Sequence, residues 1–420
     1  MSNDITLNCR LNKAHLPVMN TQQLVYVLVE AVPGAAMAQV EMPLNLSLVL
    51  DKSGSMQGRK IENLRQAAKL VVDRLGPDDL LSIVAFSDRK YRIADSGPVD
   101  DPDGLKSKID RIRDGGGTAI SGGMAQGLAE LEKGLADSGV DRVSRMLLLT
   151  DGQTFGDEKQ CKKLGAQAGD KGIVVHALGL GDDWNEDLLD EVAEASGGSA
   201  DFIDSPDKIV PFFERAVQSM QDTVVQNAQM VLRLANDVTP RQVWQVLPMI
   251  SNLGYRPLSD RDVQVGLGEL EKGQPRSLLV ELLVGPRPAG TYRLAQAEIS
   301  YDVPGLRLVG EKVKTDILLD FTADAAAAKE YDAEVMNIVE KVTAFKLQTR
   351  ALEEAKMGNI PGASQKLRAA ATRLLEMGEE ELAQSALDEA ENLEKSGQMT
   401  AHGTKKLRYE TRKLTQRLSP

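Results

Sequence analysis

The chain contains few cysteines, histidines and aromatic residues. Its two cysteines, Cys9 and Cys161, are far apart and neither belongs to a CxxC pair, which argues against a cysteine metal cluster and favours a reducing compartment. His15, His176 and His402 are scattered, so no Ser-His-Asp or Cys-His arrangement is recognisable, and His176 fits a core or strand-end position. Because aromatics make up only 4%, aliphatic side chains must fill the cores.

The sequence also lacks positive charge in excess and long apolar runs. A formal net charge of −12 argues against general nucleic-acid binding and against charge-driven attachment to anionic lipid. No apolar run approaches the ~20 residues that span a bilayer, MSNDITLNCR does not read as a secretory signal, and no GxxxxGK[ST] loop is present. We therefore expect a soluble cytoplasmic protein with no nucleic-acid or membrane partner, and the oligomeric state is left open.

The pattern of residues 43–220 alternates between buried strands and amphipathic helices. Short, nearly uninterrupted apolar runs occur at 44–50, 80–86, 145–150, 172–180 and 200–204. Such runs are typical of parallel strands covered on both faces. Between the first two, Ile61, Leu64, Ala68 and Val71 recur at helical spacing before Gly76 and Pro77. This alternation predicts a doubly wound, Rossmann-like α/β domain.

The regions on either side of that domain have other patterns. Residues 221–321 are strand-like with turn residues between the strands, which predicts an antiparallel β-sandwich. Residues 1–42 contain two more strands, which would be marginal alone, so we expect them to join the sandwich with the α/β domain inserted in it. Residues 322–420 are helical: one long helix ends at Gly358, two shorter ones follow, and the basic tail is expected to be a solvated helix.

One stretch, LSLVLDKSGSMQG at 46–58, places polar groups at the end of a buried strand. Asp51 ends the strand, and Ser53 and Ser55 follow in a loop that Gly54 allows to fold back. Ligands of open parallel sheets bind outside the carboxyl ends of the strands. Two further loops can reach the same edge: RDGGGTAISGG with Thr118, and LLLTDGQ with Asp151. These hard oxygen groups suit Mg²⁺ or Mn²⁺ better than Zn²⁺.

With these residues in place, the sequence resembles the von Willebrand factor type A (VWA) family over about residues 43–220. The metal-ion-dependent adhesion site (MIDAS) of that family is D-x-S-x-S followed by a threonine and an aspartate. All five positions are matched, by Asp51, Ser53, Ser55, Thr118 and Asp151. The overall arrangement resembles that of bacterial multi-domain members.

The resemblance implies a metal-dependent protein-binding module. In the family the serines usually bind the ion directly, and the threonine or an aspartate binds it directly or through water. Neutral hydroxyl ligands leave the ion electron-poor, so an Asp or Glu of a partner protein can complete its coordination. Mg²⁺ is the expected ion, with Mn²⁺ or Ca²⁺ as alternatives. Specificity would come from rim segments, for which the candidates are Gln57–Arg59, Asp114–Gly117, Gln153–Asp157 and Gly181–Asn185.

Two other functions compete with this interpretation. The chain could be a scaffold that binds through its helical region, with a metal that only stabilises the fold. It could also be a Mg²⁺-dependent phosphoester hydrolase of the haloacid-dehalogenase type, with Asp51 as nucleophile. That chemistry wants a second acid two residues later, where this sequence has Ser53. We therefore expect no catalytic residues and no enzymatic activity.

Overall fold

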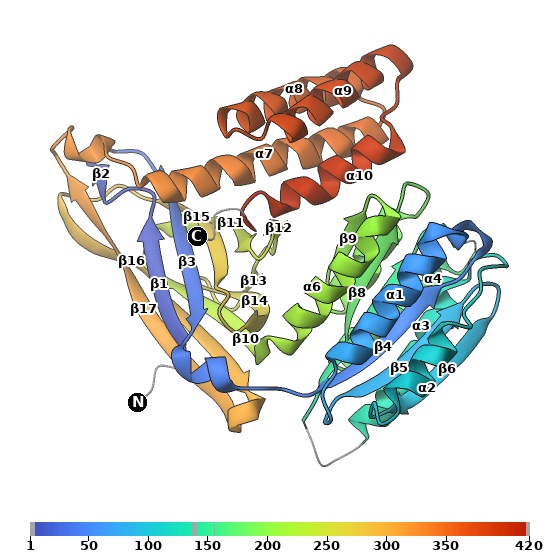
Figure 1. The fold of residues 1–420 in the computed structure, drawn as a ribbon. Coiled ribbons are helices and arrows are strands. Elements are labelled where there is room, and N and C mark those ends of the chain that lie inside the picture. Colours follow the sequence, from blue (N-terminus) through green and yellow to red (C-terminus); the bar gives the residue numbers. More distant parts are fainter. Residues whose placement is uncertain (1–4, 137–140, 155, 417–420) are drawn as a thin grey trace. The chain divides into compact units, whose positions relative to one another are not determined.

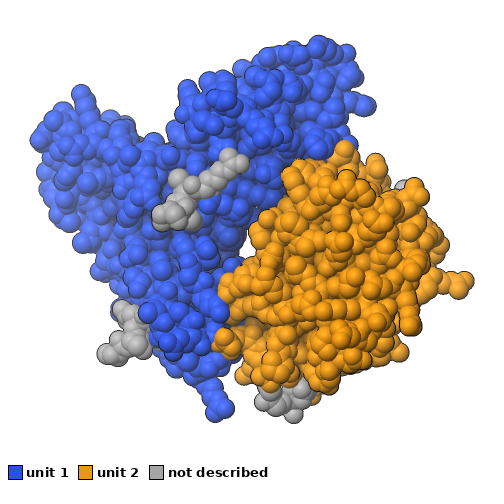
Figure 2. Space-filling view, in the orientation of Figure 1, with its two compact units in different colours: residues 1–40, 224–420 blue, residues 41–223 orange. Residues whose placement is uncertain are grey.

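The computed structural model describes residues 5–136, 141–154 and 156–416. The chain forms two compact units, shown in different colours in Figure 2. One comprises residues 41–223 and the other comprises residues 1–40 together with 224–420. The chain thus leaves the unit of residues 1–40 and 224–420 after its first strands and returns to it after residue 223.

The unit of residues 41–223 is built on one six-stranded sheet (Figure 1). In spatial order its strands are β6 (Lys90–Gly97), β5 (Leu80–Phe86), β4 (Leu44–Asp51), β7 (Val143–Thr150), β8 (Val174–Leu180) and β9 (Ala200–Ile203). Every residue of the central strands β4 and β7 is buried, as expected of strands covered on both faces. The predicted doubly wound α/β domain is confirmed.

One strand of this sheet, β6, was not predicted from the sequence. The edge strand β6 runs antiparallel to β5, whereas the other neighbouring pairs are parallel. None of its residues is fully buried, so its sequence, KYRIADSG, lacks the apolar run by which the other strands were recognised. Antiparallel edge strands are common on otherwise parallel sheets.

Six α-helices accompany this sheet: α1 (Arg59–Arg74), α2 (Pro102–Ile109), α3 (Ile120–Leu135), α4 (Glu158–Asp170), α5 (Glu186–Ala195) and α6 (Ile209–Gln221). Helix α1 buries Ile61, Leu64, Ala68 and Val71, the face that its spacing predicts. Helix α3 packs against β4, β5 and β7, and its glycines 123 and 127 allow that close approach. Both helices begin directly after loops that carry predicted site residues.

The other unit contains two sheets. The five-stranded sheet has the order β1 (Ile5–Leu11), β3 (Gln23–Pro33), β15 (Arg276–Val284), β11 (Val238–Leu247) and β12 (Ser251–Asn252). The six-stranded sheet has the order β13 (Arg256–Pro257), β14 (Asp262–Glu271), β10 (Thr223–Leu234), β16 (Gly290–Val303), β17 (Leu308–Thr322) and β2 (His15–Pro17). Each sheet therefore combines strands that precede the α/β unit in sequence with strands that follow it. Strands β2 and β17 pair in parallel, a departure from the expected antiparallel arrangement.

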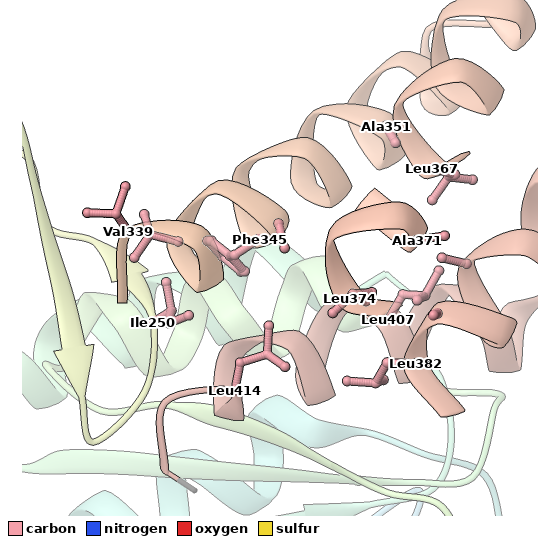
Figure 3. Packing of buried hydrophobic residues seen from close by; sticks show 14 of the residues in the cluster. Ile250, Val339, Phe345, Ala351, Leu367, Ala371, Leu374, Leu382, Leu407 and Leu414 are labelled. Atoms are coloured by element: carbon pink, nitrogen blue, oxygen red, sulfur yellow. The ribbon is translucent and has the colours of Figure 1, made fainter. Parts of the chain in front are cut away.

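Four α-helices end the described chain: α7 (Ala333–Lys356), α8 (Ile360–Glu376), α9 (Glu380–Ser396) and α10 (Ala401–Glu410). Asp332 caps α7 by accepting hydrogen bonds from the amides of Glu334 and Val335. The helices share one apolar core with Trp244 and Ile250 of the sheet region (Figure 3). The predicted helical C-terminal region is confirmed, and the long first helix ends just before Gly358.

The basic tail is packed into this core, so the expected solvated helix is wrong. Leu407, in α10, and Leu414, four residues after the end of α10, are both buried. Backbone carbonyls of the tail also accept hydrogen bonds. The amide of Ile250 donates to the carbonyl of Arg412 at 2.7 Å, and Lys341 Nζ donates to the carbonyl of Leu414 at 2.8 Å. Throughout the described ranges, no helix is both long and apolar enough to cross a membrane.

Candidate metal site

The candidate metal site begins where β4 ends, at Asp51, whose side chain is fully buried. Asp51 Oδ1 accepts a hydrogen bond from the amide of Ser53 at 2.7 Å. Asp51 Oδ2 accepts one from the hydroxyl of Thr150 at 2.6 Å. Both carboxylate oxygens are therefore engaged by the protein, and Asp51 holds the loop after β4 against the end of β7.

The two serines and Asp151 form a continuous series of oxygen contacts. The hydroxyls of Ser53 and Ser55 lie 3.0 Å apart. The Ser55 hydroxyl donates to Asp151 Oδ1 at 2.7 Å. Ser53 and Asp151 are buried, whereas Ser55 is exposed. The loop after β4 thus brings both hydroxyls to the carboxylate that follows β7.

Thr118 reaches the same place from the glycine-rich loop before α3. Its Oγ1 lies 3.3 Å, and the Ser55 Oγ lies 3.9 Å, from the point that a Cβ on Gly152 would occupy. The glycine-rich loop is hydrogen-bonded to the serine loop: the amide of Gly54 donates to the carbonyl of Gly116 at 2.9 Å. Gly116 has a φ of 89°, a left-handed conformation that favours glycine. All five predicted residues are therefore brought together by three loops.

Two residues that were not predicted from the sequence, Thr150 and Lys60, contact these five. Thr150 supports Asp51, and its position follows from the parallel register in which Leu50 of β4 pairs with Leu149 of β7. Lys60, in the first turn of α1, places its Nζ 2.5 Å from Asp151 Oδ2. The sequence does not predict this contact, because the direction in which Lys60 points depends on the turn between Ser55 and the start of α1.

The electrostatics of the site favour a nearby cation. Burial raises the pKa of Asp51, hydrogen bonds from Thr150 and Ser53 act in the opposite direction, and the charge of Asp151 raises it further. A buried carboxylate with a raised pKa is ionised at a cost unless positive charge lies close by. Asp151 already has such a partner in Lys60, whereas both oxygens of Asp51 accept only neutral donors.

The predicted rim segments are fixed to different degrees. Within the 153–157 segment, the Thr154 hydroxyl donates to the carbonyl of Thr118 at 3.2 Å. Phe155 of that segment lies outside the described residues. In the 181–185 segment, Trp184 is buried and its indole N–H donates to the carbonyl of Gly181 at 2.6 Å. Residues Gln57–Arg59 are exposed; they follow the serine loop, and Arg59 is the first residue of α1.

The donor set suits a small, hard cation. Mg²⁺ binds oxygen at about 2.0–2.1 Å, so neighbouring ligands of an octahedral site are about 3 Å apart. The separations of 3.0 Å between the serine hydroxyls and 2.7 Å between Ser55 and Asp151 are close to that value. No group of three or more His, Cys, Asp or Glu side chains that could hold a metal occurs in the described part of the chain. A metal here would therefore rely on hydroxyl as well as carboxylate oxygens.

Comparison with known proteins identifies two segments of the chain with known domains. Residues 45–215 match the von Willebrand factor type A domain, and residues 333–417 match the Sll0103-like C-terminal alpha-helical domain. The chain is 37% identical over 267 residues to the Synechocystis protein sll0103, which covers 63% of this chain and 62% of that protein. It is 30% identical over 168 residues to the mouse inter-alpha-trypsin inhibitor heavy chain H3, which covers 38% of this chain and 19% of that one.

A solved structure shares the fold over nearly the whole length. The von Willebrand factor type A protein from Catenulispora acidiphila superposes with a TM-score of 0.76 at 18% identity, covering 98% of both chains. At that identity the likeness speaks for the fold alone. The sequence matches, by contrast, span less than two thirds of the curated relatives' own lengths. Residues 45–215 of this chain are therefore a von Willebrand factor type A domain, and residues 333–417 are a Sll0103-like C-terminal helical domain.

Proposed function

We propose that the VWA domain holds a divalent cation, Mg²⁺ or Mn²⁺, and uses it to bind an acidic side chain of a partner protein. VWA domains generally mediate metal-dependent protein–protein interaction. The observation that carries the proposal is the convergence of five oxygen-bearing side chains from three loops, Asp51, Ser53, Ser55, Thr118 and Asp151.

The five residues would have two roles, binding the ion and holding its ligands in place. Ser53, Ser55 and Asp151 would hold the ion, with Thr118 and Asp51 contributing directly or through water. When bound, the ion supplies a Lewis-acidic position for a carboxylate ligand. Ser55 is exposed, so that position is open to a partner. Asp51, tied to Thr150 and to the Ser53 amide, keeps the two hydroxyls in place.

Calorimetric titration of the full chain with MnCl₂ tests the cation site. The Ser53→Ala/Ser55→Ala double variant should lose at least about tenfold in affinity, because both neutral ligands are gone. Ser107→Ala, an exposed serine on α2, is the matched control and should bind like wild type. If the folded wild-type chain takes up neither Mn²⁺ nor Mg²⁺, the proposal is wrong.

The protein partner requires a second experiment. Capture from a native lysate in Mg²⁺ should recover a partner that EDTA and the double serine variant both release. Replacing the partner's acidic residues one at a time should then abolish binding at a single Asp or Glu. Partner binding that survives in EDTA would instead favour a scaffold acting through the helical domain.

We also propose that the chain is not an enzyme and acts in the cytoplasm. Ser53, at the position where a phosphohydrolase would carry its general acid, is buried against Ser55 and Asp51. Hydrolysis of a generic phosphoester by the purified protein, lost in Asp51→Asn, would contradict the first statement. Cys9 and Cys161 are free thiols, which supports the second.

A further inference from the structure

The two oxygens of Asp151 have different partners. Oδ1 accepts the Ser55 hydroxyl at 2.7 Å, on the side of the proposed ion ligands. Oδ2 lies 2.5 Å from Lys60 Nζ. The Asp151 side chain is fully buried, and that of Lys60 is 29% exposed. The ammonium group therefore contacts one carboxylate oxygen, while the other, Oδ1, accepts the hydrogen bond from the Ser55 hydroxyl.

This contact changes the charge of the candidate metal site. Asp51 and Asp151 together carry two negative charges, enough to neutralise a divalent cation. The charge of Lys60 offsets one of them, so these three side chains together with a divalent cation would carry one positive charge. Lys52, which is adjacent to Asp51 in sequence, places its Nζ 4.7 Å from the ring centroid of Tyr91 and 3.4 Å from the carbonyl oxygen of Gly115. The lysine in contact with a site carboxylate is therefore Lys60.

We infer that Lys60 is a positioning residue that sets the charge of this site in favour of acidic ligands. It stays paired with Asp151, weakens the binding of the bare cation, and leaves one positive charge for a carboxylate to neutralise. The inference rests on the function proposed above and adds a reason why that site would select an acidic partner. It also explains why a buried carboxylate is tolerated before any ion is bound.

Replacing Lys60 by methionine separates its effect on the binding of the cation from its effect on the stability of the fold. In EDTA, Lys60→Met should lower the thermal midpoint, because Asp151 remains buried without its partner. In a titration with MnCl₂ alone, the same variant should bind about tenfold more tightly, because one positive charge near the ion is gone. A residue that merely braces the fold would lower stability and weaken, or leave unchanged, the affinity for the ion.

Two controls make the comparison specific. Lys69→Met removes the same charge from the same helix, where Lys69 pairs with Asp110 at 2.8 Å, and should leave Mn²⁺ affinity unchanged. Lys60→Arg keeps the charge and should bind Mn²⁺ like wild type. Lys60→Gln keeps a donor group without the charge and replaces Lys60→Met if that variant shows no cooperative unfolding.

The outcomes distinguish this inference from the proposed function. Tighter Mn²⁺ binding by the neutral variants, with both controls like wild type, supports it. If wild type binds Mn²⁺ and the folded neutral variants bind equally or more weakly, the inference is overturned and the metal site stands. If wild type binds no Mn²⁺, both are overturned.

Discussion

Helix α3 offers a pair of identical substitutions that should have opposite effects. A Cβ on Gly127 would lie 2.6 Å from a methyl group of Val49, 3.0 Å from Met146 Cε and 3.1 Å from Ser47 Oγ. A Cβ on Gly122, in the same helix, would have no atom within 4 Å other than those of its chain neighbours and of the nearby helix backbone. Gly122→Ala and Gly127→Ala therefore add the same methyl group to the same helix but differ in the contacts that this methyl group makes.

The expected magnitudes follow from two opposing terms. Alanine is favoured over glycine within a helix by about 1 kcal/mol. At Gly127 the added methyl overpacks the contact with the sheet, at a cost of about 1–3 kcal/mol, because Val49 is β-branched and has little rotamer freedom. Gly127→Ala should thus destabilise by up to about 2 kcal/mol, whereas Gly122→Ala should stabilise by up to about 1 kcal/mol.

Hydrogen exchange of the β4 peptide in increasing urea measures this difference within the full chain. It reports the stability of this sheet even if the two units unfold separately. The protection of β4 should fall in Gly127→Ala and rise or stay level in Gly122→Ala. Equal effects of the two variants, or a more stable Gly127→Ala, would refute the reasoning that close packing requires glycine there.

Three further predictions concern other parts of the chain. Burial, together with the charge of Arg145, lowers the pKa of His176 to about 3, so the histidine is neutral in the fold. The contribution of the neutral histidine to the free energy of unfolding is complete above the unfolded pKa of about 6.5 and is lost as pH falls, by about 2 kcal/mol at pH 5. Urea unfolding should therefore show a lower free energy of unfolding at pH 5 than at pH 7 in wild type. The difference between the two pH values should be smaller in His176→Gln. Thr150→Val keeps the side-chain shape but removes the hydrogen bond to Asp51, so Mn²⁺ affinity should fall by about tenfold in calorimetry, and an unchanged affinity would exclude this supporting role. Leu407→Ala should destabilise the helical domain by about 2–5 kcal/mol, measured by hydrogen exchange of α10, and an effect below about 1 kcal/mol would contradict the burial of the tail.

The candidate site could be located from the sequence because its residues follow buried strands. The apolar run of β4 ends at Asp51 and that of β7 ends just before Asp151, so parallel pairing alone brings both carboxylates to one edge. Lys60 could not be found in this way. Its contact with Asp151 depends on the short turn after Ser55, and a lysine on an amphipathic helix is indistinguishable by pattern from a solvated one.

The fold was predictable where burial is two-sided and less so elsewhere. Five strands of the VWA sheet were recognised from continuous apolar runs, whereas the exposed edge strand β6 has no such run. The C-terminal tail was misjudged for a related reason. Its many basic residues dominate the composition, but Leu407, Tyr409 and Leu414 are buried among them.

The pairing of β3 with β15 has a consequence for how the chain matures. Strand β3 is made early, but its partner follows about 240 residues later, a delay of roughly 12–50 s at typical rates of synthesis. The VWA domain lies wholly within that interval and can fold while β3 still waits for its neighbour. The sheet that contains β3 and β15 is therefore completed after the VWA domain has been synthesised, and β3 must stay available for pairing until then.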